Sequence, residues 1–333
     1  MSCRALLRQG GRPLGSSAPL AGIILALAFG LSCAEPALPK RNIDPWPGFS
    51  WGIYQIYWGP KKYDEMVEGA VSLLASPPQL IMFYRDLGRG FPGEGCRIID
   101  ARGATPILSL ELWHWGGGRD RGSTLPAILA GEYDKFFRSY ARDARLYGKP
   151  VFLRFGFEMN GDWFSWGNQP VEFVAAWQRA HRIFAEESAE NVIWVWAPNF
   201  VSIPRENNPI ESYYPGDEFV DWVGADGYNF GDNHDQWHHW ESFAEVFDPI
   251  LSTFSEHYPS KPVMIAEFGS SPGVGEAKAE WILDAYAEIK QRPKIRAAVW
   301  FNLDKRREGE PNWKIDSDPG SLDAFNRSFA RPR

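Results

Sequence analysis

The sequence predicts an α/β protein, a single (β/α)8 (TIM) barrel, from two observations. Short apolar runs of strand length recur at 49–56, 80–87, 105–112, 150–158, 191–199, 220–229, 262–269 and 295–303. They are apolar nearly throughout, which is typical of strands buried on both faces of a parallel sheet. Segments of helical spacing separate most of them, and eight strands alternating with helices indicate a closed barrel.

Apolar residues at helical spacing predict the helices between these runs. The stripes fall at 133–144, 174–184, 243–254 and 282–289, with a shorter one at 322–329 after the eighth strand. Residues 202–219 lack this spacing, so we expect a short or missing helix between the fifth and sixth strands.

The first 34 residues have the composition of an export signal. Three arginines and no acid precede an apolar run at 20–31, and small residues follow it at 32–34. The apolar run is too short for a comfortable membrane span. We therefore expect residues 1–34 to be a signal peptide, either ordinary or of the lipoprotein type anchored through Cys33. The protein would then be secreted or periplasmic, or lipid-anchored.

The rest of the chain divides into a proline-containing linker at 35–48 and one domain at 49–333. Loss of the three arginines changes the net charge from −7 to −10, which argues against nucleic acid and suits a neutral substrate. Cys96 is the only cysteine in the domain, so we expect neither a disulfide framework nor a cysteine metal site. The 16 tryptophans suit a bulky core or a surface that stacks on sugar rings.

Polar and aromatic residues follow the predicted strands where a barrel carries its site. They are Glu111 to Trp115, Glu158, Trp196 to Asn199, Asp226 to Asn229, Glu267 and Trp300 to Asn302. Glu158 and Glu267 end the fourth and seventh strands, on opposite sides of the barrel. Glycoside hydrolysis needs such a pair, because one carboxyl protonates the leaving oxygen while the other attacks carbon or activates water. We expect them about 5 Å apart, the retaining arrangement.

Strand alternation places Arg154, Gly156 and Glu158 on one face. Arg154 should therefore point inward, beneath the acid. There its charge and hydrogen bonds can keep the second carboxylate ionised.

Four segments resemble glycoside hydrolase family 26. They are 158–167 (EMNGDWFSWG), 191–199 (NVIWVWAPN), 214–228 and 261–269 (KPVMIAEFG). The resemblance covers about residues 49–330 and implies a barrel with its acid on strand four and its nucleophile on strand seven. Members are mostly endo-β-1,4-mannanases, with some mixed-linkage β-glucanases and β-1,3-xylanases.

The resemblance implies a role for each matching residue. Glu158 is then the general acid/base and Glu267 the nucleophile, with a tyrosine contacting it. The matching substrate-site residues are Arg154, Trp163, Trp166, Tyr228 and Trp300, the last as the floor of a sugar subsite.

One position departs from the family pattern: Phe157 stands where the family usually has histidine before the acid. Either a nearby His114, Asn160 or Asn199 replaces it, or the chain has altered specificity. With Trp113, these complete the predicted substrate-binding residues.

The sequence thus predicts a retaining endo-β-glycanase, most simply an endo-1,4-β-mannanase, that acts as a monomer on β-linked polysaccharide without cofactor, metal or protein partner. A non-catalytic glycan-binding barrel is the alternative from another class. A metal site at His234, His238 and His239 is a third hypothesis.

Overall fold

The computed structural model describes residues 48–54, 63–116, 122–232, 234 and 238–329. The predicted signal peptide and all of the predicted linker except Gly48 lie outside the described residues. Within the described residues, no helix is both long enough and apolar enough to span a bilayer.

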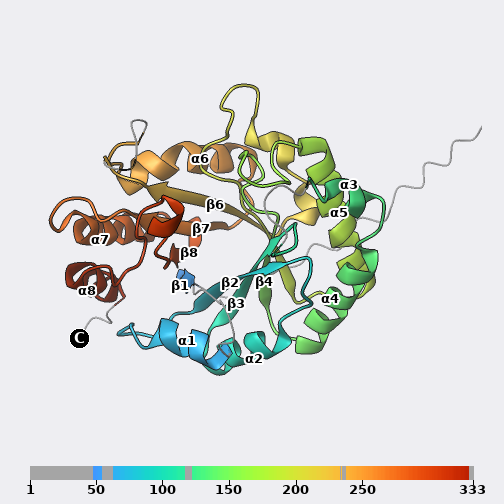
Figure 1. Ribbon diagram of the computed structural model, residues 1–333, viewed down its shortest axis with the longest axis horizontal. Helices are drawn as coiled ribbons and strands as arrows, with labels where there is room; N and C mark the ends of the chain where they lie inside the picture. The colour runs from blue at the N-terminus through green and yellow to red at the C-terminus, as the bar shows by residue number, and fades with distance from the viewer. Residues whose placement is uncertain (1–47, 55–62, 117–121, 233, 235–237, 330–333) are drawn as a thin grey trace, which may run out of the picture. The chain divides into compact units, whose positions relative to one another are not determined.

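The described strands form one closed parallel barrel in chain order, which confirms the predicted fold (Figure 1). Its members are β1 (Ser50–Tyr54), β2 (Leu80–Asp86), β3 (Thr105–Glu111), β4 (Val151–Phe155), β5 (Val192–Trp196), β6 (Trp222–Asn229), β7 (Val263–Ser270) and β8 (Ile295–Phe301). Each lies within one predicted apolar run, except that β7 extends one residue further. The last pairing, of β1 with β8, closes the cylinder.

Helices surround the barrel. They are α1 (Tyr63–Val71), α2 (Gly93–Ala101), α3 (Leu125–Leu129), α4 (Asp134–Tyr147), α5 (Pro170–Glu186), α6 (Phe243–His257), α7 (Ala277–Lys290) and α8 (Pro319–Ser328). As predicted, no α-helix joins β5 to β6: this fully described connection holds two short 3-10 helices, η1 (Ile210–Tyr213) and η2 (Asp217–Phe219). A third, η3 (Arg306–Glu308), follows β8.

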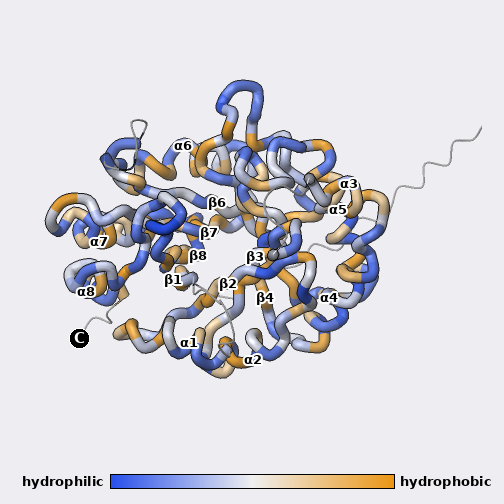
Figure 2. The backbone as a smooth tube through the Cα atoms, in the orientation of Figure 1, coloured by the Kyte–Doolittle hydropathy of each residue, from blue (hydrophilic) through white to orange (hydrophobic). Residues whose placement is uncertain are grey.

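Aromatic side chains fill the layer between strands and helices. Phe155 on β4 packs edge-on against Trp177 of α5 at 5.7 Å, and Trp177 contacts Trp194 of β5 at 5.3 Å. Figure 2 shows orange segments along the strands and orange alternating with blue along the helices, as helices with one buried face require. Much of the tryptophan content is therefore core.

Candidate active site

The chain between β4 and the first candidate carboxyl depends on a glycine. Gly156 has φ +56°, and a Cβ there would lie 2.7 Å from Leu112 Cδ1. Glu158 is itself left-handed, with φ 51°, and its amide donates to the Ala197 carbonyl at 2.8 Å. The chain thus turns at the end of β4 and is held against the end of β5.

The Glu158 carboxyl is buried among neutral hydrogen-bond donors. Asn199 Nδ2 donates to Oε1 and Trp163 Nε1 donates to Oε2, each at 2.7 Å. Burial first, and then the negative charge of Glu267, raise the pKa of Glu158 to about 7 against the opposing effect of the two donors. The group therefore holds its proton up to near neutral pH, as a general acid must.

Asn160 holds Asn199 in place. Its Oδ1 accepts from the Asn199 amide at 2.8 Å, and its Nδ2 donates to the Asn199 carbonyl at 2.9 Å. Asn160 is fully buried. The prediction that Asn160 binds substrate is therefore wrong, because both ends of its amide serve the loop that presents Asn199.

Glu267, on β7, is surrounded by charged and hydroxyl donors. Its Oε1 accepts from Tyr84 Oη and from Arg154 Nη1, both at 2.5 Å. Its Oε2 accepts from Tyr228 Oη at 2.7 Å. The residue is 4% exposed. Three donors, one of them a cation, thus converge on the two oxygens of this carboxylate and hold it in place as a nucleophile requires.

Arg154 points inward, as strand alternation predicts, and joins four strands. Beyond Glu267, Nη1 donates to Ser109 Oγ of β3 at 2.8 Å and Nη2 is paired with Asp226 of β6. Burial alone would lower the pKa of Arg154, but Asp226 and Glu267 raise it above the ordinary value. Arg154 is fully buried, so the prediction that it binds substrate is corrected: it holds carboxylates instead.

Phe157 covers the guanidinium of Arg154. The Arg154 Cζ lies 4.7 Å from the centre of the Phe157 ring, within the range of a cation–π contact. The ring also contacts those of Tyr84 at 5.3 Å and Phe164 at 5.2 Å, and Phe157 is 3% exposed. The residue that departs from the family pattern thus contributes an apolar cover to the ion-pair network.

The tryptophans near the acid have different positions. Trp163 is half-buried and bonded to Glu158, so it lines the site. Trp113 is also half-buried. Trp166 is fully buried, stacks on Phe164 at 4.4 Å and donates to the Phe157 carbonyl at 2.9 Å. The prediction that Trp166 binds sugar is therefore wrong, because it supports the loop from below.

Trp300 also requires a correction. It is fully buried and faces the helix layer, where it packs against Trp281 of α7 and Phe325 of α8. It therefore does not floor a sugar subsite. The neighbouring Phe301 faces inward, stacking on Tyr54 with ring centres 4.8 Å apart.

Sequence reasoning missed Tyr84 and Tyr54, and it gave Phe301 no role of its own. Tyr84 donates to Glu267, and the Tyr54 ring packs edge-on against the Tyr84 ring, with centres 5.0 Å apart. The alternation of Met82, Tyr84 and Asp86 along β2 was the available signal. It could have placed Tyr84 on the same face as an acid at the end of the strand.

Three of the predicted histidines contact aromatic side chains. His114 Nε2 hydrogen-bonds Tyr133 Oη at 2.9 Å. His234 and His238 pack against Phe230, with ring centres 4.7 and 4.4 Å away. The residues between these two histidines lie outside the described part. Among the described residues, no group of three or more His, Cys, Asp or Glu could hold a metal ion.

A proton-holding carboxyl after β4 and an ion-paired carboxylate on β7 place this chain in the class of barrels that carry a glycosidase-type acid pair. The sequence model "Glycosyl hydrolase family 26" matches residues 138–296, which include both glutamates. The match runs from α4 to the start of β8, and this part of the chain is similar to that family.

Two named relatives match parts of the chain. The chain is 34% identical over 210 residues to Endoglucanase H of Acetivibrio thermocellus, covering 61% of this chain and 22% of the relative. It is 34% identical over 192 residues to Mannan endo-1,4-beta-mannosidase A and B of Caldalkalibacillus mannanilyticus, covering 55% and 32%. The chain thus matches a third or less of the length of either relative.

Among solved structures, the catalytic domain of a GH26 endo-beta-1,4-mannanase from Bacillus sp. JAMB-750 superposes with a TM-score of 0.63. The match has 18% identity and covers 85% of this chain and 86% of that one. At this identity the likeness supports the fold alone.

Proposed function

We propose that this chain is a retaining endo-β-glycanase that hydrolyses β-1,4-mannan. The observation that carries the proposal is the contrast between the two carboxyls: Glu158 keeps its proton up to about pH 7, while three donors stabilise the Glu267 anion. A retaining glycosidase needs one carboxyl of each kind.

The reaction takes two steps. Glu267 attacks the anomeric carbon while Glu158 gives its proton to the leaving oxygen, which breaks the glycosidic bond and forms a glycosyl ester. Glu158 then accepts a proton from water, whose oxygen attacks the anomeric carbon and releases Glu267. Esterification removes the negative charge that helps to raise the pKa of Glu158, so that pKa falls when the group must act as a base.

Mannan is the first substrate to test, because several matched relatives are named as mannan endo-1,4-β-mannosidases. Mixed-linkage β-glucan is the second. One observation favours it: the relative named Endoglucanase H matches more of this chain than the first mannosidase does. In addition, Phe157, the residue before the acid, lies over Arg154 and offers no polar group to a sugar.

The test is hydrolysis of β-mannan, mixed-linkage β-glucan and β-1,3-xylan by the purified chain, with product lengths followed over time. We expect release of mixed oligosaccharides from mannan, with the β-anomer formed first by proton NMR. Release of the α-anomer first would exclude the retaining mechanism. Binding to a glycan without new reducing ends would replace the proposal with a glycan-binding barrel.

We further propose that the protein is exported, through cleavage of residues 1–34 or anchoring at Cys33, and acts as a monomer on polysaccharide. The arginine-rich start and the following apolar run support this location. Mass spectrometry of the mature N-terminus distinguishes the two forms, because a lipoprotein begins with a lipid-modified cysteine. An intact residue-1 terminus on the protein from cells would contradict export by this signal.

A further inference from the structure

A further carboxyl group near the site takes no part in the two-step reaction. It belongs to Glu111, the last residue of β3. Two residues earlier on the same strand, Ser109 accepts from Arg154. On β2, Tyr84 pairs in register with Ser109 and Asp86 with Glu111. Since side chains two apart share a face, Glu111 lies directly above the residues that hold Glu267 and Arg154.

The residues around Glu111 fix its position. Trp115 Nε1 donates to Glu111 Oε2, and the Trp115 amide donates to Asp86 Oδ2 at 2.8 Å. The Arg89 guanidinium lies over the Trp115 ring, 4.4 Å from its centre. Contacts on its main chain, its ring nitrogen and its ring thus hold Trp115, and Trp115 in turn orients Glu111.

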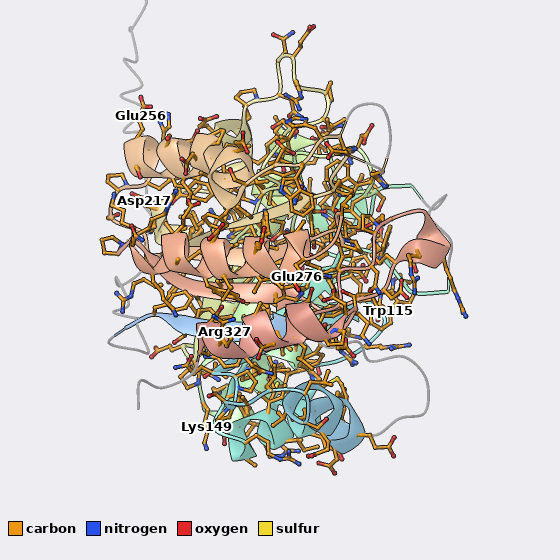
Figure 3. The ribbon with its side chains drawn as sticks, turned by 90° about the vertical axis from the view of Figure 1, so that its left-hand side faces the viewer. Trp115, Lys149, Asp217, Glu256, Glu276 and Arg327 are labelled. Atoms are coloured by element: carbon orange, nitrogen blue, oxygen red, sulfur yellow. The ribbon has the colours of Figure 1, made fainter. Side chains whose placement is uncertain are left out.

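Glu111 and Trp115 lie at the end of the barrel where substrate would bind. In Figure 3, Trp115 is at the opposite end of the molecule from Lys149 and Asp217. Those two residues precede β4 and β6 and so mark the amino ends of the strands. Trp115 therefore lies at the carboxyl ends, with the candidate active site.

Two carboxyl groups, those of Glu111 and Asp86, come from paired positions of β3 and β2 at this edge of the site. Glu111 is half-buried, and no cation pairs with it among the described residues. Asp86 is 3% exposed, and its Oδ1 has no hydrogen-bond partner within the described part of the chain, although Arg89 Nε lies 3.6 Å from it as an ion pair. Burial raises the pKa of Glu111 to about 7, because its carboxylate loses water that the donors of the protein do not fully replace. Donors from a bound ligand would therefore stabilise this carboxylate. A sugar ring offers such donors in its hydroxyl groups.

We propose that Glu111 is a specificity-determining residue, which accepts hydrogen bonds from hydroxyl groups of a sugar on the glycosyl side of the cleaved bond. This inference rests on the proposed function. The side follows from the placement, because Glu111 stands above Tyr84 and Ser109, next to the nucleophile, whereas Asn199 and Trp163 hold the acid. In this arrangement Trp115 is a positioning residue that acts through Glu111.

The test uses aryl β-glycosides with one, two and three units of the preferred sugar, because the aryl group leaves and all sugars lie on the glycosyl side. For Glu111→Ala we expect kcat/KM to fall at least about ten-fold on the substrate whose sugar reaches Glu111. Glu111→Gln, which keeps an acceptor oxygen, should lose less. The matched control is Glu308→Gln, a carboxylate whose side chain is 58% exposed on η3 after β8; we expect no change.

A double-mutant cycle tests whether Trp115 acts through Glu111. Trp115→Phe keeps a ring but removes the indole donor, so we expect a smaller loss. Glu111→Ala with Trp115→Phe should be no worse than Glu111→Ala alone. Equal kcat/KM for wild type and Glu111→Ala on every length would overturn the inference, as would an additive loss in the double variant.

A binding measurement keeps this inference separate from the proposed function. Calorimetry in the Glu267→Ala background compares the affinity for mannan and glucan oligosaccharides with Glu111 present and replaced by alanine. About ten-fold weaker binding supports the inference even if the wild-type chain hydrolyses nothing. Unchanged affinity overturns it even if the enzyme is active.

Discussion

The two glutamates of the site are the same residue type in one barrel, yet their surroundings differ in kind. Glu158 meets the neutral donors of Asn199 and Trp163. Glu267 meets the guanidinium of Arg154 and the hydroxyls of two tyrosines. Burial acts on both, but only Glu267 has a buried cation beside it.

In the proposed mechanism, the different roles of the two carboxyls therefore come from their neighbours and not from the carboxyl itself. Without a cation, burial and the charge of Glu267 keep Glu158 protonated. Arg154 also pairs with Asp226, so one guanidinium contacts two buried carboxyl groups. The two carboxyls are coupled electrostatically, because the negative charge of Glu267 favours the protonated form of Glu158.

The largest effect should come from removing the nucleophile. Glu267→Ala should lower kcat on polysaccharide by a factor on the order of 10⁴ or more, because no covalent intermediate can form. Added azide should restore part of the activity on an activated aryl glycoside and yield a glycosyl azide of inverted configuration. A variant that retains wild-type kcat would show that Glu267 is only a partner of Arg154.

Removal of the acid should have an effect that depends on the leaving group. Glu158→Gln should lower kcat/KM on polysaccharide by about 10²- to 10⁴-fold, because the leaving sugar needs a proton. An aryl glycoside with a very acidic phenol needs none, so its first step should be much less affected. Equal losses on both substrates, measured by initial rates, would contradict the role of Glu158 as acid.

The pH profile tests the neutral surroundings of Glu158. Because Glu158 must be protonated, kcat/KM should fall as pH rises through about 7, the raised pKa produced first by burial and then by Glu267. Asn199 opposes that rise, since its hydrogen bond favours the anion. Asn199→Ala should therefore move the alkaline limb to higher pH. A shift to lower pH would show that Asn199 does not act on the ionised form.

The barrel could be predicted from sequence because its strands are buried on both faces. All eight strands fall at the predicted apolar runs, and the irregular link between β5 and β6 was visible as missing helical spacing. The prediction that both glutamates end their strands is only approximate: Glu158 lies three residues after the end of β4, and Glu267 lies within β7, three residues before its end. Their catalytic roles remain predictions until the variants are measured.

What sequence could not supply is the direction of side chains beyond the ends of strands. Asn160 and Trp166 follow the acid in a polar loop, and only the fold shows that both turn inward beneath it. Tyr84 lies 183 residues from Glu267, so only barrel closure brings them together. On β8, Trp300 and Phe301 are adjacent large aromatics, and nothing in their order shows which faces the axis.

This pair gives the prediction with the smallest effect on activity. Trp300→Phe removes the indole that donates to the Trp313 carbonyl at 2.8 Å and leaves space against Trp281 and Phe325. We expect a loss of about 2 kcal/mol in the free energy of unfolding, seen as a lower Tm, because a buried carbonyl loses its donor and core packing is reduced. Since Trp300 faces the helices, KM should stay near wild type. A large rise in KM at unchanged Tm would instead place Trp300 in the sugar site.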